Sequence, residues 1–306
     1  MFSFLRKHRE IRYHSRFGGL WVDRLDASKE LSRRLSKGGL SPELGRKISR
    51  FIADGYLILP GAVDSGVVER IATAMTDAFE RGDERLRYQG TSDEIHLCEG
   101  NTDPRGKRVV EAHAVLSDVR DAFASPPVVE FLTAIFDEPP VLSQSLMFQM
   151  GSEQPIHRDT TFVRFDKPLC MVGCWIALED VRPGSGELSY IVGSHRLPDF
   201  PFSTGKKDAS EANPDELHAS FGWLVTESDK RGLTREVFRA RKGDVLFWHA
   251  DLAHGGSPIT DPRLTRQSIV GHLSPYSVGR STFAASAVRR QHGPIHYSST
   301  YYDLAG

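Results

Sequence analysis

The sequence has few cysteines: Cys98, Cys170 and Cys174 are three among 306 residues. Their odd number and their lack of zinc-ligand spacing argue against a disulfide framework and against a structural zinc site. We therefore expect buried thiols in a reducing compartment, and a cytoplasmic location.

Long apolar runs are missing too. No stretch approaches the ~20 apolar residues that cross a bilayer. Arg6, Lys7 and Arg9 follow directly on the short apolar start, which is not the pattern of a secretory signal. No basic patch interleaved with aromatic residues occurs, so nucleic acid is not an expected partner. No heptad repeat indicates an oligomer, and the sequence leaves the oligomeric state open.

Charge is unevenly distributed. Residues 1–50 contain 13 basic and 5 acidic residues, an excess of eight positive charges, although the whole chain has a net charge of −1. The basic segment predicts a solvated helical N-terminal extension over residues 1–40, followed by a single domain over 41–306. A contact with an anionic surface and a transit peptide are the alternatives for the extension.

Helix signals come first in the chain and strand signals come later. Ser41-Pro42 and Asp64 are typical helix starts, and a third helix is predicted over Val128–Phe136. Short β-rich runs follow, at Val141–Met150, Leu169–Leu178, Leu188–Val192, Val237–Ala240, Val245–Trp248 and Gln267–Leu273. Without βαβ alternation, this order favours an α+β fold or an all-β core supported by helices.

Two segments show no clear pattern. Residues 83–110 are polar and predict a surface excursion that could fold over a site. Pro198–Lys230 is too long for a plain connection, so we expect a functional loop or a flexible insertion.

A short motif, Ile156-His157-Arg158-Asp159, indicates chemistry. In a strand, His157 and Asp159 would point to the same face. One imidazole and one carboxylate are two parts of the 2-His-1-carboxylate triad that binds non-haem Fe(II). A third ligand is available about a hundred residues later, where His249 and His254 follow an apolar run.

These segments resemble the phytanoyl-CoA dioxygenase family of Fe(II)/2-oxoglutarate oxygenases. The similarity extends to Trp175–Val181, to Gly184–His195 with its Gly-Ser-His ending, and to Arg266–His272, and it runs over roughly residues 45–280. The resemblance implies a mostly β fold with flanking helices, whose core is a double-stranded β-helix (a jelly-roll, cupin-like) supported by N-terminal helices.

The resemblance also implies a ligand set. His157, Asp159 and His254 would hold the metal, with His249 as the alternative third ligand. The family's pattern places its ligand at the second histidine, and His254-Gly255-Gly256-Ser257 fits that pattern.

The co-substrate residues follow from the same resemblance. Arg266 would bind the distal carboxylate of 2-oxoglutarate, with Arg263 as the alternative because the spacing is one residue longer than expected. Trp175 would flank the co-substrate or pack in the core. Ser257 could donate to the same carboxylate, although the family's hydroxyl falls nearer Gly256.

The predicted activity is hydroxylation of a C–H bond in a small-molecule or carrier-linked substrate, using Fe(II), 2-oxoglutarate and O₂ and releasing succinate and CO₂. Asp159 argues against halogenation, because related halogenases have a small residue there. Desaturation and ring closure would use the same residues. The alternatives are a cupin-like metal enzyme without 2-oxoglutarate and a non-catalytic binding module.

Substrate recognition is less defined. Arg158, Arg164 and Lys167 could meet a carboxylate or phosphate of the substrate, or form an exposed face. The tyrosines Tyr297, Tyr301 and Tyr302 could pack over the site or close the domain.

Overall fold

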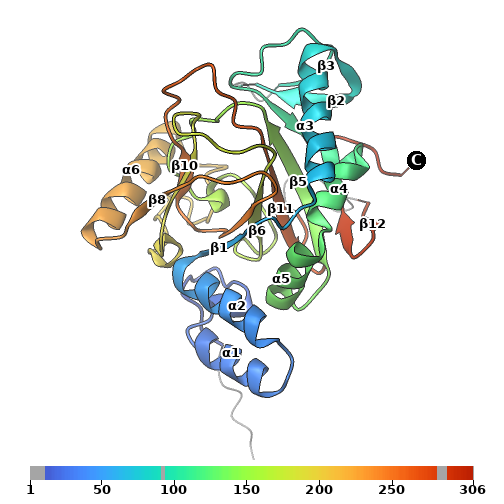
Figure 1. The fold of residues 1–306 in the computed structure, drawn as a ribbon. Coiled ribbons are helices and arrows are strands. Elements are labelled where there is room, and N and C mark those ends of the chain that lie inside the picture. Colours follow the sequence, from blue (N-terminus) through green and yellow to red (C-terminus); the bar gives the residue numbers. More distant parts are fainter. Residues whose placement is uncertain (1–10, 91–93, 281–287, 306) are drawn as a thin grey trace, which may run out of the picture.

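Two mostly antiparallel sheets face each other in the computed structural model, which describes residues 11–90, 94–280 and 288–305 (Figure 1). The larger sheet has ten strands, ordered β1-β9-β6-β11-β5-β4-β2-β3, with β13 paired to β5 and β12 paired to β13, and the smaller sheet is β10-β7-β8. The basic residues Arg6, Lys7 and Arg9 lie outside the described residues.

The strands of the larger sheet are β1 (Tyr56–Leu59), β2 (Asp83–Gln89), β3 (Ile95–Cys98), β4 (Arg108–Val110), β5 (Pro140–Phe148), β6 (Val172–Ala177), β9 (Val245–His249), β11 (Ser268–Pro275), β12 (Arg290–His292) and β13 (Ile295–Tyr297). Those of the smaller sheet are β7 (Leu188–Ile191), β8 (Arg235–Phe238) and β10 (His254–Gly256). The α-helices are α1 (Ala27–Ser36), α2 (Pro42–Asp54), α3 (Ser65–Glu80), α4 (Ser117–Phe123), α5 (Pro126–Phe136) and α6 (Pro214–Lys230).

The predicted β core supported by helices is confirmed. Both N-terminal helix starts are capped: the Ser41 side chain accepts a hydrogen bond from the Leu44 N–H, and Asp64 accepts from Gly66 and Val67. The capped helices α2 and α3 pack with α5 on the outer face of the larger sheet, and together they bury the main hydrophobic cluster.

Residue alternation separates the two faces of the larger sheet. In β9, Val245 and Phe247 join the cluster under the helices, whereas Leu246 and Trp248 join a second cluster between the two sheets. His249 therefore points to the outer face. This alternation decides which side chains reach the space between the sheets.

Residues 83–110, predicted as a surface excursion, contain strands that the sequence analysis did not predict. They form β2, β3 and β4, which extend the larger sheet because Val109 and Val110 of β4 pair with Met147 and Leu146 of β5. The insertion Pro198–Lys230 also contains regular structure, because Asn213 caps the 17-residue helix α6 by accepting from the Glu216 N–H.

The N-terminal extension is not solvated along its whole length. A 3-10 helix, η1 (Trp21–Asp23), and one side of α1 are buried, and Leu20, Trp21 and Leu31 belong to the main cluster. A domain boundary near residue 40 stays a prediction. In the described part of the chain, no helix is both long enough and apolar enough to span a membrane. All three cysteines are buried and unpaired.

Candidate metal and co-substrate site

Backbone pairing brings two histidines together. The His157 N–H donates to the carbonyl of His254 at 2.9 Å, and the His254 N–H donates to the carbonyl of His157 at 3.0 Å. This single bridge lies at the edge of the smaller sheet. His254 begins β10, after a turn that follows β9, and Asp159 begins the 3-10 helix η3 (Asp159–Thr161). The predicted convergence of His157 and Asp159 is therefore produced by a bridge and a turn, and not by one continuous strand.

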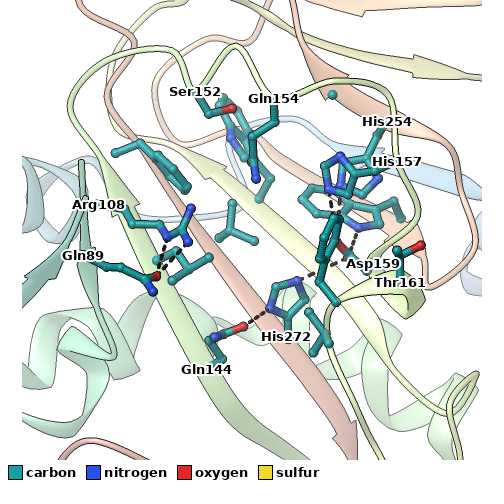
Figure 2. Close-up of a pocket in the computed structure, with 18 of the residues that line it drawn as sticks. Gln89, Arg108, Gln144, Ser152, Gln154, His157, Asp159, Thr161, His254 and His272 are labelled. Atoms are coloured by element: carbon teal, nitrogen blue, oxygen red, sulfur yellow. Dashed lines mark hydrogen bonds and ion pairs between the residues drawn. The ribbon is translucent and has the colours of Figure 1, made fainter. Parts of the chain in front are cut away.

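The three side chains offer ligand atoms to one point. His157, Asp159 and His254 are buried, and their ligand atoms all lie within 4.8 Å of one another (Figure 2). Asp159 Oδ1 is 3.5 Å from His254 Nε2 and 3.9 Å from His157 Nε2. Two imidazoles and one carboxylate are the donor set expected for Fe(II).

Both imidazoles are held in the tautomer that a metal needs. His157 Nδ1 is 2.8 Å from the carbonyl oxygen of Pro155, and His254 Nδ1 is 2.9 Å from that of Leu252. Because a carbonyl oxygen only accepts, each Nδ1 carries the proton, and the lone pair of each Nε2 faces the Asp159 carboxylate.

Local electrostatics favour the metal-binding protonation states. Burial, and then the proximity of His254, lower the pKa of His157 to about 4. Burial alone would raise the pKa of Asp159, but His272 and His254 beside it outweigh that effect and hold the pKa below its ordinary value. At neutral pH the site therefore presents a neutral His157 and an ionised Asp159.

Three further residues position the carboxylate, and the sequence analysis gave none of them this role. Trp248 donates its indole N–H to Asp159 Oδ2 at 2.6 Å, and His272 Nε2 lies 3.2 Å from the same oxygen. His272 Nδ1 is 2.8 Å from Oε1 of Gln144 on the neighbouring strand. Alternation along β11 offered a signal for His272, which lies six residues after Arg266 and so on the same face.

Arg266 is a buried cation without a partner for its Nε. Its residue exposure is 2%, and neither Arg266 Nε nor Trp175 Nε1 has a hydrogen-bond partner in the described part of the chain. Burial lowers the pKa of Arg266 to about 10, against the opposing effect of Glu187 and Glu179. A guanidinium buried in this way fits a carboxylate ligand, and the Trp175 ring lies 5.9 Å away.

A cavity of about 770 Å³ joins the triad to Arg266 and Trp175. Its wall comes from both sheets: Phe148, Trp175, Trp248 and Val270 lie on the larger sheet, and Leu188 on the smaller. The cavity therefore occupies the space between the sheets. The volume of the cavity, and its mixture of apolar and polar side chains, are typical of a small-molecule binding site.

The structure keeps the other candidates away from the triad. His249 lies on the outer face of β9, where its Nε2 is 2.9 Å from Asp23 Oδ1. The Arg263 side chain is 86% exposed and pairs with Asp261. Ser257 is not among the residues lining the cavity. Trp175 and Arg266 are thus brought together with the triad, whereas His249, Arg263 and Ser257 are not.

The chain is similar in sequence or in fold to several known proteins. A rat protein, "Phytanoyl-CoA dioxygenase domain-containing protein 1", is 28% identical over 273 residues, covering 76% of this chain and 90% of the relative. The solved non-heme alpha ketoglutarate dependent epimerase SnoN from nogalamycin biosynthesis superposes with a TM-score of 0.57 at 21% identity, covering 84% of this chain and 98% of the epimerase. EctD from S. alaskensis, solved with bound Fe, gives a TM-score of 0.54 at 18% identity, covering 78% of both chains.

Fold and site together define the class of the protein: it is an oxygenase that depends on Fe(II) and 2-oxoglutarate. The phytanoyl-CoA dioxygenase family model matches residues 51–268, most of the chain, and the protein belongs to that family. The predicted family and enzyme class are confirmed.

Proposed function

We propose that the protein hydroxylates a C–H bond of a small-molecule or carrier-linked substrate while converting 2-oxoglutarate to succinate and CO₂. One observation carries the proposal: the triad of His157, Asp159 and His254 shares a cavity with Arg266, a buried guanidinium whose Nε lacks a partner. A metal site alone would suit many reactions, but a metal site beside an unsatisfied buried cation suits a dicarboxylate co-substrate.

Each residue has a defined task in this proposal. Nε2 of His157, Nε2 of His254 and Oδ1 of Asp159 hold Fe(II), which, with 2-oxoglutarate and O₂, supplies the oxidising power. Arg266 binds the distal carboxylate of 2-oxoglutarate. The indole N–H of Trp248 keeps Asp159 Oδ2 occupied, so that Oδ1 is the oxygen offered to the metal. Apolar side chains between the sheets keep bulk water away.

The presence of Asp159 supports hydroxylation over halogenation, because its carboxylate takes the position that a halide would need. The same fold is used by the epimerase SnoN and by the non-heme alpha ketoglutarate dependent carbocyclase SnoK. Product analysis is therefore part of the test: hydroxylation predicts a product heavier by one oxygen atom, formed together with one succinate.

The first experiment is an anaerobic titration of metal-free protein with Fe(II) and 2-oxoglutarate. We expect a weak visible charge-transfer band, lost in His254→Ala. In Arg266→Gln, the 2-oxoglutarate concentration needed for half of the band should rise roughly 10–100-fold, because a charge-assisted contact is removed from a buried site. Arg263→Gln is the matched control, since it removes an exposed guanidinium three residues away.

Other outcomes would favour other functions. Metal binding without a charge-transfer band would support a cupin-like enzyme that does not use 2-oxoglutarate. A loss of the band in Arg263→Gln alone would move the co-substrate contact to Arg263. Absence of metal binding would support a binding module. Succinate formation that stayed coupled to substrate in Asp159→Ala would contradict the assigned triad.

A further inference from the structure

The insertion Pro198–Lys230, between β7 and β8, packs against the two segments that carry the ligand histidines. Leu224 of α6 belongs to a small apolar cluster together with Ile156 and Ala253. Each of these last two residues directly precedes one of the ligand histidines in the chain. The insertion is therefore in contact with the segments that position both imidazoles.

The insertion also forms part of the cavity wall. Ala209, Ser210 and Leu217 are among the residues that line the cavity. The Ala209 N–H donates to the carbonyl oxygen of Thr161 at 3.0 Å. Thr161 is the last residue of the metal-binding turn, by which we mean His157–Thr161. A backbone hydrogen bond thus joins this part of the wall to the turn that supplies two of the ligands.

Buried charges connect the insertion to the same turn. Lys207 is only 7% exposed, and its Nζ donates to Asp251 Oδ2 at 2.5 Å and also to Asp199. The other oxygen of Asp251 accepts a hydrogen bond from Thr160 Oγ1 at 2.6 Å. Asp251, itself 2% exposed, therefore links a lysine of the insertion to the residue that directly follows the ligand Asp159.

Arg158 adds a second connection. It lies between two ligands in the sequence, and its guanidinium donates to three backbone carbonyls where the insertion begins, those of Ser194, Leu197 and Pro198, at 3.0–3.1 Å. Its Nη1 is also 3.7 Å from Asp251 Oδ2. Arg158 is buried in these contacts, so it forms neither an exposed face nor a substrate contact. The metal-binding motif thus also supplies a cation that holds the start of the insertion.

We propose that Asp251 is a positioning residue for the reaction. Through Thr160 and Lys207 it holds the metal-binding turn and the insertion in one arrangement, so that metal binding and docking of the insertion as a cavity wall stabilise each other. Such a coupling between two sites is reciprocal. The inference deepens the proposed function and rests on it, because the docked wall bounds the space in which the substrate meets the metal.

The first test measures metal binding. Lys207→Met removes the lysine that Asp251 holds, and Asp251→Asn removes the charge at almost constant size while Lys207 keeps Asp199 as a partner. In each variant we expect the affinity for Co(II), followed by its visible spectrum, to fall about tenfold, as is typical when support for a metal ligand is lost. Lys206→Met is the matched control, because Lys206 is exposed and pairs with Glu211 at the surface. Its Co(II) affinity should match that of the wild type.

The second test measures docking of the insertion. Hydrogen exchange, read by mass spectrometry of the peptide that contains Ala209, reports on the hydrogen bond to Thr161. In the wild type, Co(II) should slow this exchange. In Co(II)-loaded Lys207→Met and Asp251→Asn, the exchange should be about tenfold faster than in the wild type, whereas Lys206→Met should behave like the wild type.

A double variant separates positioning from a general loss of stability. Thr160→Val removes the hydroxyl on the other side of Asp251. If Thr160 and Lys207 act through Asp251, the Lys207→Met/Thr160→Val protein should lose no more Co(II) affinity than the weaker-binding single variant, because the connection is already broken. Independent structural damage would instead give losses that add.

The proposal is overturned if Lys207→Met and Asp251→Asn bind Co(II) as Lys206→Met does, if the exchange does not respond to Co(II), or if the losses add. Circular dichroism shows whether each variant is folded. Should Lys207→Met fail to fold, Asp251→Asn provides the same comparison with Lys206→Met.

Failure of the proposed function would look different. It would appear as the missing charge-transfer band or the missing effect of Arg266→Gln, and neither measurement involves a residue of the insertion. Binding of Co(II) requires no 2-oxoglutarate, so the comparison of Lys207→Met with Lys206→Met reports on the coupling through Asp251 alone.

Discussion

The two oxygens of Asp159 have separate partners. Oδ1 faces the two histidines, while Oδ2 accepts the indole N–H of Trp248 and lies beside His272. A carboxylate held at one oxygen by a neutral donor cannot rotate freely to offer both oxygens to the metal. The geometry of the metal site therefore depends on a tryptophan that is not one of the three candidate ligands.

Replacing that tryptophan tests its role. Trp248→Phe removes the 2.6 Å hydrogen bond but keeps an aromatic side chain between the sheets. We expect metal affinity to fall roughly 10–100-fold, as is typical when a residue supporting a metal ligand is lost. Titration with Co(II), followed by its visible spectrum, measures the change.

Trp175→Phe is the control, because the indole N–H of Trp175 has no partner among the described residues. Its metal affinity without 2-oxoglutarate should match that of the wild type. Equal affinities for all three proteins would show that the hydrogen bond from Trp248 contributes nothing to metal binding.

At the scale of the elements, the pairing of β6 with β9 determines where the Trp248 indole lies. Gly173 of β6 pairs directly with Trp248 of β9, and a Cβ built on Gly173 would lie 2.1 Å from Trp248 Cε2 and 2.2 Å from its Nε1. The absence of a side chain at residue 173 is what allows the indole to lie against β6 and reach Asp159.

Gly173→Ala should therefore damage both stability and the metal site. Overpacking of this kind typically costs about 1–3 kcal/mol of unfolding free energy, and displacement of Trp248 should also weaken metal binding. Urea unfolding and metal titration measure the two effects. Gly222→Ala in α6, where a Cβ meets nothing within 4 Å, should instead stabilise the protein slightly. A Gly173→Ala protein as stable as the wild type would contradict the close fit.

The site residues that the sequence predicted are close together in the chain or belong to a recognisable motif. His157 and Asp159 are two residues apart, and His254 and Arg266 follow one another within a single segment. Gln144 depends instead on register, because it meets His272 only through the pairing of β5 with β11. A single sequence gives the alternation along each strand but not the pairing between strands.

Three elements, β2, β4 and α6, were not predicted from the sequence. Strand β2 is mostly polar and strand β4 has only three residues, so neither gives a clear strand signal. Both depend on pairing, β4 with the edge of β5 and β2 with β4. Helix α6 has few buried side chains, so its apolar pattern is weak, although Asn213-Pro214-Asp215-Glu216 is a recognisable helix start. Solvation of the N-terminal segment was overestimated because its basic residues outnumber the few apolar ones that anchor it.

Across the whole molecule, buried histidines link stability to pH. Burial is the main cause that lowers the pKa of His113, His157 and His195, and that of His157 falls to about 4 from 6.5. The unfolded chain takes up protons at these residues near pH 6.5, whereas the folded protein does not. Because the unfolded state then binds more protons, the unfolding free energy decreases as pH falls below that value.

Metal-free protein should thus lose stability between pH 6.5 and pH 5, where unfolded carboxylates are still largely ionised. Each of the three histidines contributes at most about 1.4 kcal/mol per pH unit, so the combined slope is positive and no larger than roughly 4 kcal/mol per unit. Urea unfolding at several pH values measures the slope, and His195→Asn should reduce it, because one of the three buried imidazoles is removed. A slope near zero over this interval would mean that the folded protein accepts these protons, and so that the imidazoles, His157 included, are not kept neutral for a metal.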